Sequence, residues 1–196
     1  ELVSVDIEPT ELEPVEAMVL ESGYGSVDDA FASAGCIVEL DLEIGRHSGV
    51  PMETRGLLAR LDPESKVLQL YGASKVPHYN CAAIASMLNL DPESVVGLEG
   101  HVGGGFGIRG ELYPEDVLVA WVACLLKRPV KWIEDRREHL VAANHSRDQR
   151  HRVRAAADPS GVIVAIDDEF WCDQGAYVRT HGATVPSLTA AMLPGP

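Results

Sequence analysis

The sequence lacks several features that mark common protein classes. No stretch approaches the roughly 18 uninterrupted apolar residues of a membrane-spanning helix. Its four cysteines, at positions 36, 81, 124 and 172, form no CxxC pair and have no close histidine partner. They also do not match the ligand spacings of an iron–sulfur cluster. We therefore expect no membrane span, free thiols rather than a disulfide framework, and a reducing, cytoplasmic compartment.

Positive charge is scarce. The chain has 16 Lys and Arg against 30 Asp and Glu, for a net charge of −14. Residues 1–64 hold 15 acids against three arginines, a balance of −12, which leaves −2 for residues 65–196. The basic residues gather between Lys127 and Arg154, without interleaved aromatics. Because the rest of the chain would repel phosphates, we predict no nucleic-acid partner and expect this basic stretch to meet a cofactor phosphate or an acidic neighbouring domain.

The apolar content is sufficient for one core, since 46% of the 196 residues are hydrophobic. The patterns predict an α/β (α+β) fold: a mixed sheet with βαβ units covered by helices, plus a C-terminal β-hairpin. Expected strands are 36–44, 56–61, 66–72, 94–102 and 129–133, with hairpin strands 149–157 and 162–171. Expected helices are 79–88, 114–126 and 134–143. Helix 114–126 is apolar almost all round, which predicts burial under other elements.

The most informative stretch is the glycine loop at residues 103–110. It holds five glycines and one phenylalanine, follows an apolar run and precedes the predicted helix at Pro114. Glycine takes positive φ freely and lets a ligand approach the backbone closely. A loop of this kind ahead of a helix directs N–H groups at one point, so an oxyanion or phosphate is the expected ligand.

A dinucleotide is one candidate ligand. Gly105, Gly107 and Gly110 satisfy GxGxxG, and Glu134 or Asp135 follows at the distance of a ribose-binding carboxylate. The predicted helix, however, begins at Pro114 rather than inside the glycine pattern, so the loop is longer than a nicotinamide site requires. A glycine turn without any ligand also stays open.

Four longer segments resemble a known family. They are GGGFG (103–107), PEDVLVAW (114–121), RPVKWIEDRREHLVAANHSR (128–147) and DQGAYVRTHG (173–182). Together they resemble the large, molybdenum-binding subunit of the molybdenum hydroxylases, which include xanthine dehydrogenase, aldehyde oxidase and the aerobic carbon monoxide dehydrogenase large chain. The resemblance extends from about Glu39 to Pro196. It implies that residues 35–196 are the first molybdenum-cofactor-binding domain, incomplete at its C-terminal end, and that residues 1–34 are a connector from an upstream domain.

The resemblance also implies site residues. Its carry-over assigns cofactor binding to Gly104, Gly105, Phe106, Gly107, Lys75 and Arg109. Phe106 and Glu53 are expected to line the substrate pocket. No catalytic residue and no direct metal ligand is expected here, because the family's base, a glutamate, lies further along the polypeptide. The 196 residues alone are therefore expected to be inactive.

Two positions depart from the family pattern. Lysine stands at position 75, where many relatives have a glutamine that donates to the metal's oxo ligand, and Gly110 stands where purine hydroxylases have an acid. A purine substrate is therefore not expected. Lys75 is expected either to keep the donor role or to pair with a surface carboxylate, and a scaffold domain that has lost the cofactor is an alternative. For Glu53, a plain salt bridge with Arg46 or Arg55 is the alternative to a pocket role.

The implied activity is oxidation of an aldehyde or N-heterocycle with oxygen derived from water. The implied cofactor is molybdenum with molybdopterin, in the plain or the cytosine dinucleotide form. [2Fe–2S] clusters and FAD are expected on other subunits or domains. The expected partners are thus an iron–sulfur subunit, an FAD subunit, the remaining part of the large subunit and a small-molecule substrate.

Overall fold

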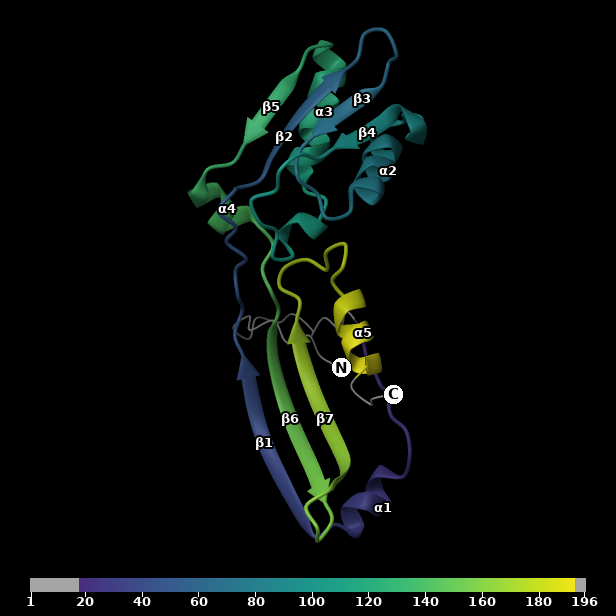
Figure 1. Cartoon of the computed structure of the whole chain (residues 1–196), viewed down its shortest axis with the longest axis vertical. Helices are drawn as coiled ribbons and strands as arrows, with labels where there is room; N and C mark the ends of the chain where they lie inside the picture. Colours follow the sequence, from purple (N-terminus) through teal and green to yellow (C-terminus); the bar gives the residue numbers. More distant parts are fainter. Residues whose placement is uncertain (1–17, 193–196) are drawn as a thin grey trace, which may run out of the picture. The chain divides into compact units, whose positions relative to one another are not determined.

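The computed structural model describes residues 18–192, which form two compact units. Unit 1 combines the segments before Ser48 and after His145, and unit 2 is the continuous stretch Ser48–His145 (Figure 1). Residues 1–17 of the expected connector lie outside the described part. The expected domain boundary between residues 34 and 35 stays a prediction.

Unit 1 is built on a three-stranded antiparallel sheet in the order β1-β6-β7. Strand β1 (Cys36–Ile44) pairs with β6 (Asp148–Ala157), which pairs with β7 (Ile163–Asp173). The predicted C-terminal hairpin is confirmed, and its turn is closed by the Asp158 carboxylate, which accepts from the Ser160 and Val162 N–H groups. Helices α1 (Val27–Ala32) and α5 (Thr184–Met192) complete the unit.

One face of this sheet carries the charged residues, because the acids of β1 and the arginines of β6 alternate with other residues in the same register. Arg150, Arg152 and Arg154 project from one face of β6, opposite Glu43, Asp41 and Glu39 of β1. Arg154 lies 3.2 Å from Glu39, and Arg152 lies 3.0 Å from Glu169 of β7. Acids on the neighbouring strands already pair with these arginines, so the expectation that the basic stretch meets a cofactor phosphate or an acidic neighbouring domain stays a prediction for its other cations. Sequence spacing alone could not show that residues 39–43 would lie beside residues 150–154.

Unit 2 contains a four-stranded mixed sheet in the order β4-β3-β2-β5. Its strands are β2 (Gly56–Leu61), β3 (Leu68–Tyr71), β4 (Val95–Leu98) and β5 (Val130–Ile133). Only β3 and β4 pair in parallel, through helix α2 (Pro77–Leu88), whereas β2 is antiparallel to both its neighbours. The mixed sheet with a βαβ unit is confirmed, but the chain crosses from β4 through α3 (Pro114–Leu126) to the opposite edge instead of adding a neighbouring strand.

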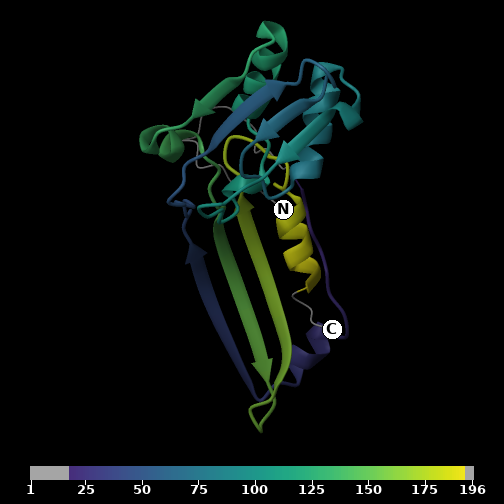
Figure 2. The ribbon, with the colours of Figure 1, turned by 45° about the horizontal axis from the view of Figure 1, so that its top comes forward.

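The core of unit 2 lies where α2 and α3 pack together on the sheet (Figure 2). Leu68, Ile84, Ala85, Ala120 and Ala123 are almost fully buried there. Helix α3 buries Val119, Ala120 and Ala123, as its apolar composition predicts, but its outward residues are exposed in the described part of the chain. The exposed residues are Leu118, Trp121, Leu125 and Leu126.

Candidate functional site

The glycine loop connects the end of β4 to the short 3₁₀ helix η2 (Ile108–Gly110). Its backbone takes positive φ at Gly104 (103°), Phe106 (48°) and Gly107 (89°). Glycine accepts such angles without cost, but a side-chain-bearing residue in this region costs on the order of 1–2 kcal/mol. Phe106 therefore keeps its conformation only because the surrounding contacts hold the loop.

Two side chains brace the loop from within unit 2. Arg109, which is 7% exposed, donates from Nε to the Gly104 carbonyl oxygen (2.8 Å) and from Nη2 to the Glu53 carboxylate (2.8 Å). The same carboxylate oxygen accepts from the Gly103 N–H at 2.8 Å. Because Gly103 would place an added Cβ only 2.4 Å from the Glu53 Cβ, this position requires glycine.

These contacts show that Glu53 has a structural role. Its carboxylate does form an ion pair, but with Arg109 rather than with the expected Arg46 or Arg55. Arg46 pairs with Asp173, and Arg55 pairs with Glu134. About half of the Glu53 side chain stays exposed, so the expected pocket role stays a prediction beside this structural one.

The middle of the loop presents unused hydrogen-bond donors. Within the described part of the chain, the N–H groups of Gly104, Gly105, Phe106 and Gly107 have no hydrogen-bond acceptor. A Cβ added at Gly105 or Gly107 would meet no atom within 4 Å, so both backbones face open space. Phe106 is 77% exposed. Successive free N–H groups on an irregular backbone are the donor set that binds anionic or oxygen-rich groups, so the loop fits the anionic ligands of a molybdopterin cofactor.

The two expected cations differ in placement. The Arg109 guanidinium is directed inward to Glu53 and to loop carbonyl groups, including those of Thr54 and Glu53 (3.2 and 3.1 Å). The Lys75 side chain is exposed, and its Cδ lies 3.5 Å from the position that a Cβ would take at Gly110. The backbone N–H of Lys75 donates to the Arg109 carbonyl at 2.9 Å. Its ammonium has no acidic partner among residues 18–192, so the expected pairing with a surface carboxylate is absent there.

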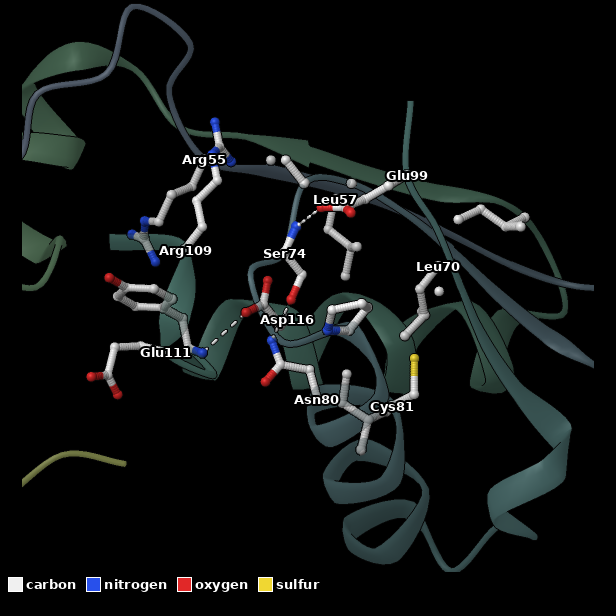
Figure 3. A pocket seen from close by; sticks show the side chains of 18 residues that line it. Arg55, Leu57, Leu70, Ser74, Asn80, Cys81, Glu99, Arg109, Glu111 and Asp116 are labelled. Carbon is white, nitrogen blue, oxygen red and sulfur yellow. Dashed lines mark hydrogen bonds between the residues drawn. The ribbon is translucent and has the colours of Figure 1, made fainter. Parts of the chain in front are cut away.

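A small cavity of about 60 Å³ lies behind Arg109 and Glu111, between the sheet and the starts of α2 and α3 (Figure 3). The Asn80 side-chain oxygen is buried without a donor, while its nitrogen donates to Ser74 at 3.1 Å. Burial raises the pKa of the Asp116 carboxyl, although a hydrogen bond from the Tyr113 N–H opposes this shift. Ligand pockets usually measure roughly 300–1,000 Å³, so this cavity has room for a few waters rather than for a substrate ring.

The dinucleotide interpretation is wrong on geometry. Glu134, the candidate ribose ligand, is fully buried in contacts with Arg55 and His139. Asp135 instead caps helix α4 (Arg136–Ala142) by accepting from the N–H groups of Arg137 and Glu138. The sheet is also mostly antiparallel, whereas a dinucleotide fold places its glycine loop on a parallel sheet.

Several structural residues of this region were not identified from the sequence. The Tyr113 hydroxyl donates to the Ile108 carbonyl at 3.0 Å and accepts from the Asn144 N–H at 3.0 Å, which fixes the far end of the loop. Glu111, beside Gly110, is buried and accepts from the Asn144 side chain. The only sequence signal was position: Tyr113 directly precedes the proline that starts α3.

Other site classes find no support among residues 18–192. No group of three or more His, Cys, Asp or Glu side chains there could hold a metal ion directly. The cysteines described are free thiols, and burial raises the pKa of Cys81, Cys124 and Cys172. No helix in this range is long and apolar enough to cross a membrane.

Comparison with known proteins places these features in context. A family model described as the molybdopterin cofactor-binding domain matches residues 11–196. The 6-hydroxypseudooxynicotine dehydrogenase complex subunit gamma of Paenarthrobacter nicotinovorans is 37% identical over all of this chain and 27% of its own length. The nicotine 6-hydroxylase large subunit of the same organism is 35% identical over 80% of this chain and 19% of its own.

A solved structure is similar as well. Quinoline 2-oxidoreductase from Pseudomonas putida 86 matches 76% of this chain and 19% of its own chain, with a TM-score of 0.69 and 32% identity. The chain thus spans 27% or less of the length of these relatives.

Proposed function

The chain belongs to the molybdopterin cofactor-binding domain family, and we propose that its glycine loop is the part that contacts the cofactor. The supporting observation is the run of four free N–H groups from Gly104 to Gly107, beside the open backbone of Gly105. When bound, the cofactor supplies the metal that transfers an oxygen derived from water and takes up two electrons. The chain's own contribution is to hold the cofactor's anionic groups by backbone N–H groups that are already in place.

Phe106 and Glu53 are proposed to form part of the substrate pocket. The Phe106 ring is exposed and adjoins the free N–H groups, so it can pack against a flat substrate. The Glu53 carboxylate keeps one oxygen without a described hydrogen bond, because Arg109 and Gly103 both bind Oε2. Lys75 lies beside Gly110 and is proposed to contribute a positive charge at the same edge.

The proposed activity of the whole protein is hydroxylation or oxidation of an aldehyde or N-heterocycle. Relatives named for nicotine, 6-hydroxypseudooxynicotine and quinoline chemistry favour N-heterocycles as the first substrates to test. The relatives' names also describe a complex subunit and a large subunit. We therefore propose a large subunit that works with an iron–sulfur subunit and an FAD subunit, which would carry electrons away from the molybdenum.

A steric block tests the loop assignment. Gly105→Val places a side chain where no protein atom lies within 4 Å, so the protein should fold while the cofactor is excluded. Gly100→Val is the matched control, because its Cβ also meets nothing within 4 Å but the residue lies outside the run of free N–H groups. In the full-length protein purified with its partner subunits, Gly105→Val should contain at least about tenfold less molybdenum and pterin than the control. Equal cofactor content in the two variants would refute the assignment.

A further inference from the structure

The glycine loop rests on a segment that is here called the seat, residues 49–55. A Cβ added at Gly49 would lie 3.1 Å from the Phe106 carbonyl oxygen and 3.0 Å from Ile108 Cγ1. Further along the seat, the Cβ of Pro51 lies 3.0 Å from the Cβ position of Gly104. Together with the hydrogen bonds that the Glu53 carboxylate accepts from Gly103 and Arg109, these contacts mean that the loop cannot move far unless the seat moves.

The seat is in turn held from behind by the buried Glu134 and His139. One Glu134 carboxylate oxygen accepts from the Arg55 N–H (2.8 Å) and the other from Arg55 Nε (2.9 Å). The Glu134 backbone adds two bonds, from its N–H to the Arg55 carbonyl (3.0 Å) and from the Thr54 hydroxyl to its own carbonyl (2.8 Å). His139 Nδ1 lies 2.6 Å from Glu134, and its Nε2 lies 2.9 Å from the Gly49 carbonyl oxygen.

Burial makes these contacts difficult to replace. The side chains of Glu134 and His139 are 0% exposed, and that of Arg55 is 7% exposed. A buried charge that loses its partner cannot be solvated by water, so the surrounding backbone must shift instead. The backbone attached to this cluster is the seat. Arg55 also stacks on Tyr113, with its Cζ 3.7 Å from the ring centroid, and Tyr113 holds the other end of the loop.

We infer that Glu134 and His139 are positioning residues, which set the shape of the glycine loop through the seat without touching a ligand. The two ring nitrogens of His139 lie within hydrogen-bond distance of the Glu134 carboxylate and the Gly49 carbonyl group, so glutamine, whose polar atoms lie at one end of the side chain, cannot reach both partners. The consequence for cofactor retention rests on the proposed function. The effect on loop shape does not.

The test compares Glu134→Gln and His139→Gln in the full-length protein with its partner subunits. Residue-resolved hydrogen–deuterium exchange should be about tenfold faster at the Ile108 and Gly110 N–H groups, which donate to the Gly105 and Gly107 carbonyls (3.0 and 3.1 Å), whereas exchange in α2 should be unchanged. Molybdopterin should dissociate at least about tenfold faster than from the wild-type protein. Arg137→Gln, which changes an exposed residue of α4, the helix that carries His139, should alter neither the exchange rate nor the dissociation rate. Ile84→Val, in the core of the same unit, should lower the melting temperature without a selective effect on the loop.

Each outcome is decisive. Loop exchange at the wild-type rate in His139→Gln would overturn the inference, as would a rise that is equal in the loop and in α2. If Glu134→Gln does not fold, His139→Gln still decides, since it leaves the Glu134–Arg55 contacts intact. A wild-type protein without molybdopterin would instead refute the proposed function, and the exchange comparison would still test the positioning role.

Discussion

Replacing Arg109 by methionine should loosen the glycine loop and destabilise unit 2. Methionine keeps much of the apolar stem but removes the guanidinium, which is 5% exposed at the side chain. The loss includes the bond to the Gly104 carbonyl at 2.8 Å and longer bonds to the carbonyl groups of Glu53 and Thr54.

The magnitude follows from these contacts. A hydrogen bond from a charged donor contributes about 1.5 kcal/mol net at the low end, and we allow about 0.5–1 kcal/mol for the two longer bonds, which share one nitrogen. The ion pair with Glu53 adds less than about 1 kcal/mol, because the glutamate side chain is 45% exposed and solvent screens it. The expected loss is thus about 2–3 kcal/mol. For a unit of about 100 residues this lowers Tm by on the order of 10 °C.

Thermal unfolding of the 196-residue chain, followed by circular dichroism and calorimetry, measures this change. Arg60→Met is the matched control: its guanidinium lies 3.8 Å from Asp62 and the side chain is 49% exposed. That variant should lose less than about 0.5 kcal/mol. Equal melting temperatures for the two variants would show that Arg109 does not brace the loop.

Three further predictions concern the same region. Phe106→Gly should leave the free energy of unfolding unchanged or raise it by up to about 1 kcal/mol, because it relieves a positive φ, whereas Phe106→Ala keeps a Cβ at this φ and should not gain this stability. Both variants should lower the cofactor content of the full-length protein. A loss of stability of the glycine variant in urea unfolding would contradict this prediction. Gly103→Ala should destabilise by about 1–3 kcal/mol, since its Cβ would lie 2.4 Å from that of Glu53, while Gly105→Ala should cost under about 1 kcal/mol; the same urea titrations compare them. Burial alone would raise the pKa of Glu134, but hydrogen bonds from its arginine and histidine partners outweigh it and the net pKa is lowered from 4.5. Its contribution to stability is therefore present above pH 4.5 and disappears as the pH falls through the lower folded-state pKa, so Glu134→Gln should show a shallower loss of stability in acid than the wild-type chain, and equal slopes would argue against the ion pair.

Local patterns were sufficient to predict the elements themselves. Strand 36–44, strand 56–61 and helix 114–126 have the expected bounds because their apolar periodicity and end signals, such as Pro114 at the start of a helix, are local. The Asp-Pro-Ser-Gly turn likewise predicted the hairpin at residues 148–173.

What the sequence could not provide is the pairing of distant residues. Glu134 lies 79 residues from Arg55, and Arg109 lies 56 residues from Glu53. No local periodicity records such contacts, so a carboxylate that holds the seat was open to interpretation as a ribose ligand. The same limit applies to the arginines of β6, whose partners on β1 lie more than a hundred residues earlier.

The most direct test is a molybdenum and pterin assay on the full-length parent protein, purified with its neighbouring subunits from a host supplied with molybdate. We expect about one molybdenum and one pterin for each large subunit, and their loss in Gly105→Val but not in Gly100→Val. A folded wild-type complex without either component would contradict the proposal that this glycine loop binds molybdopterin.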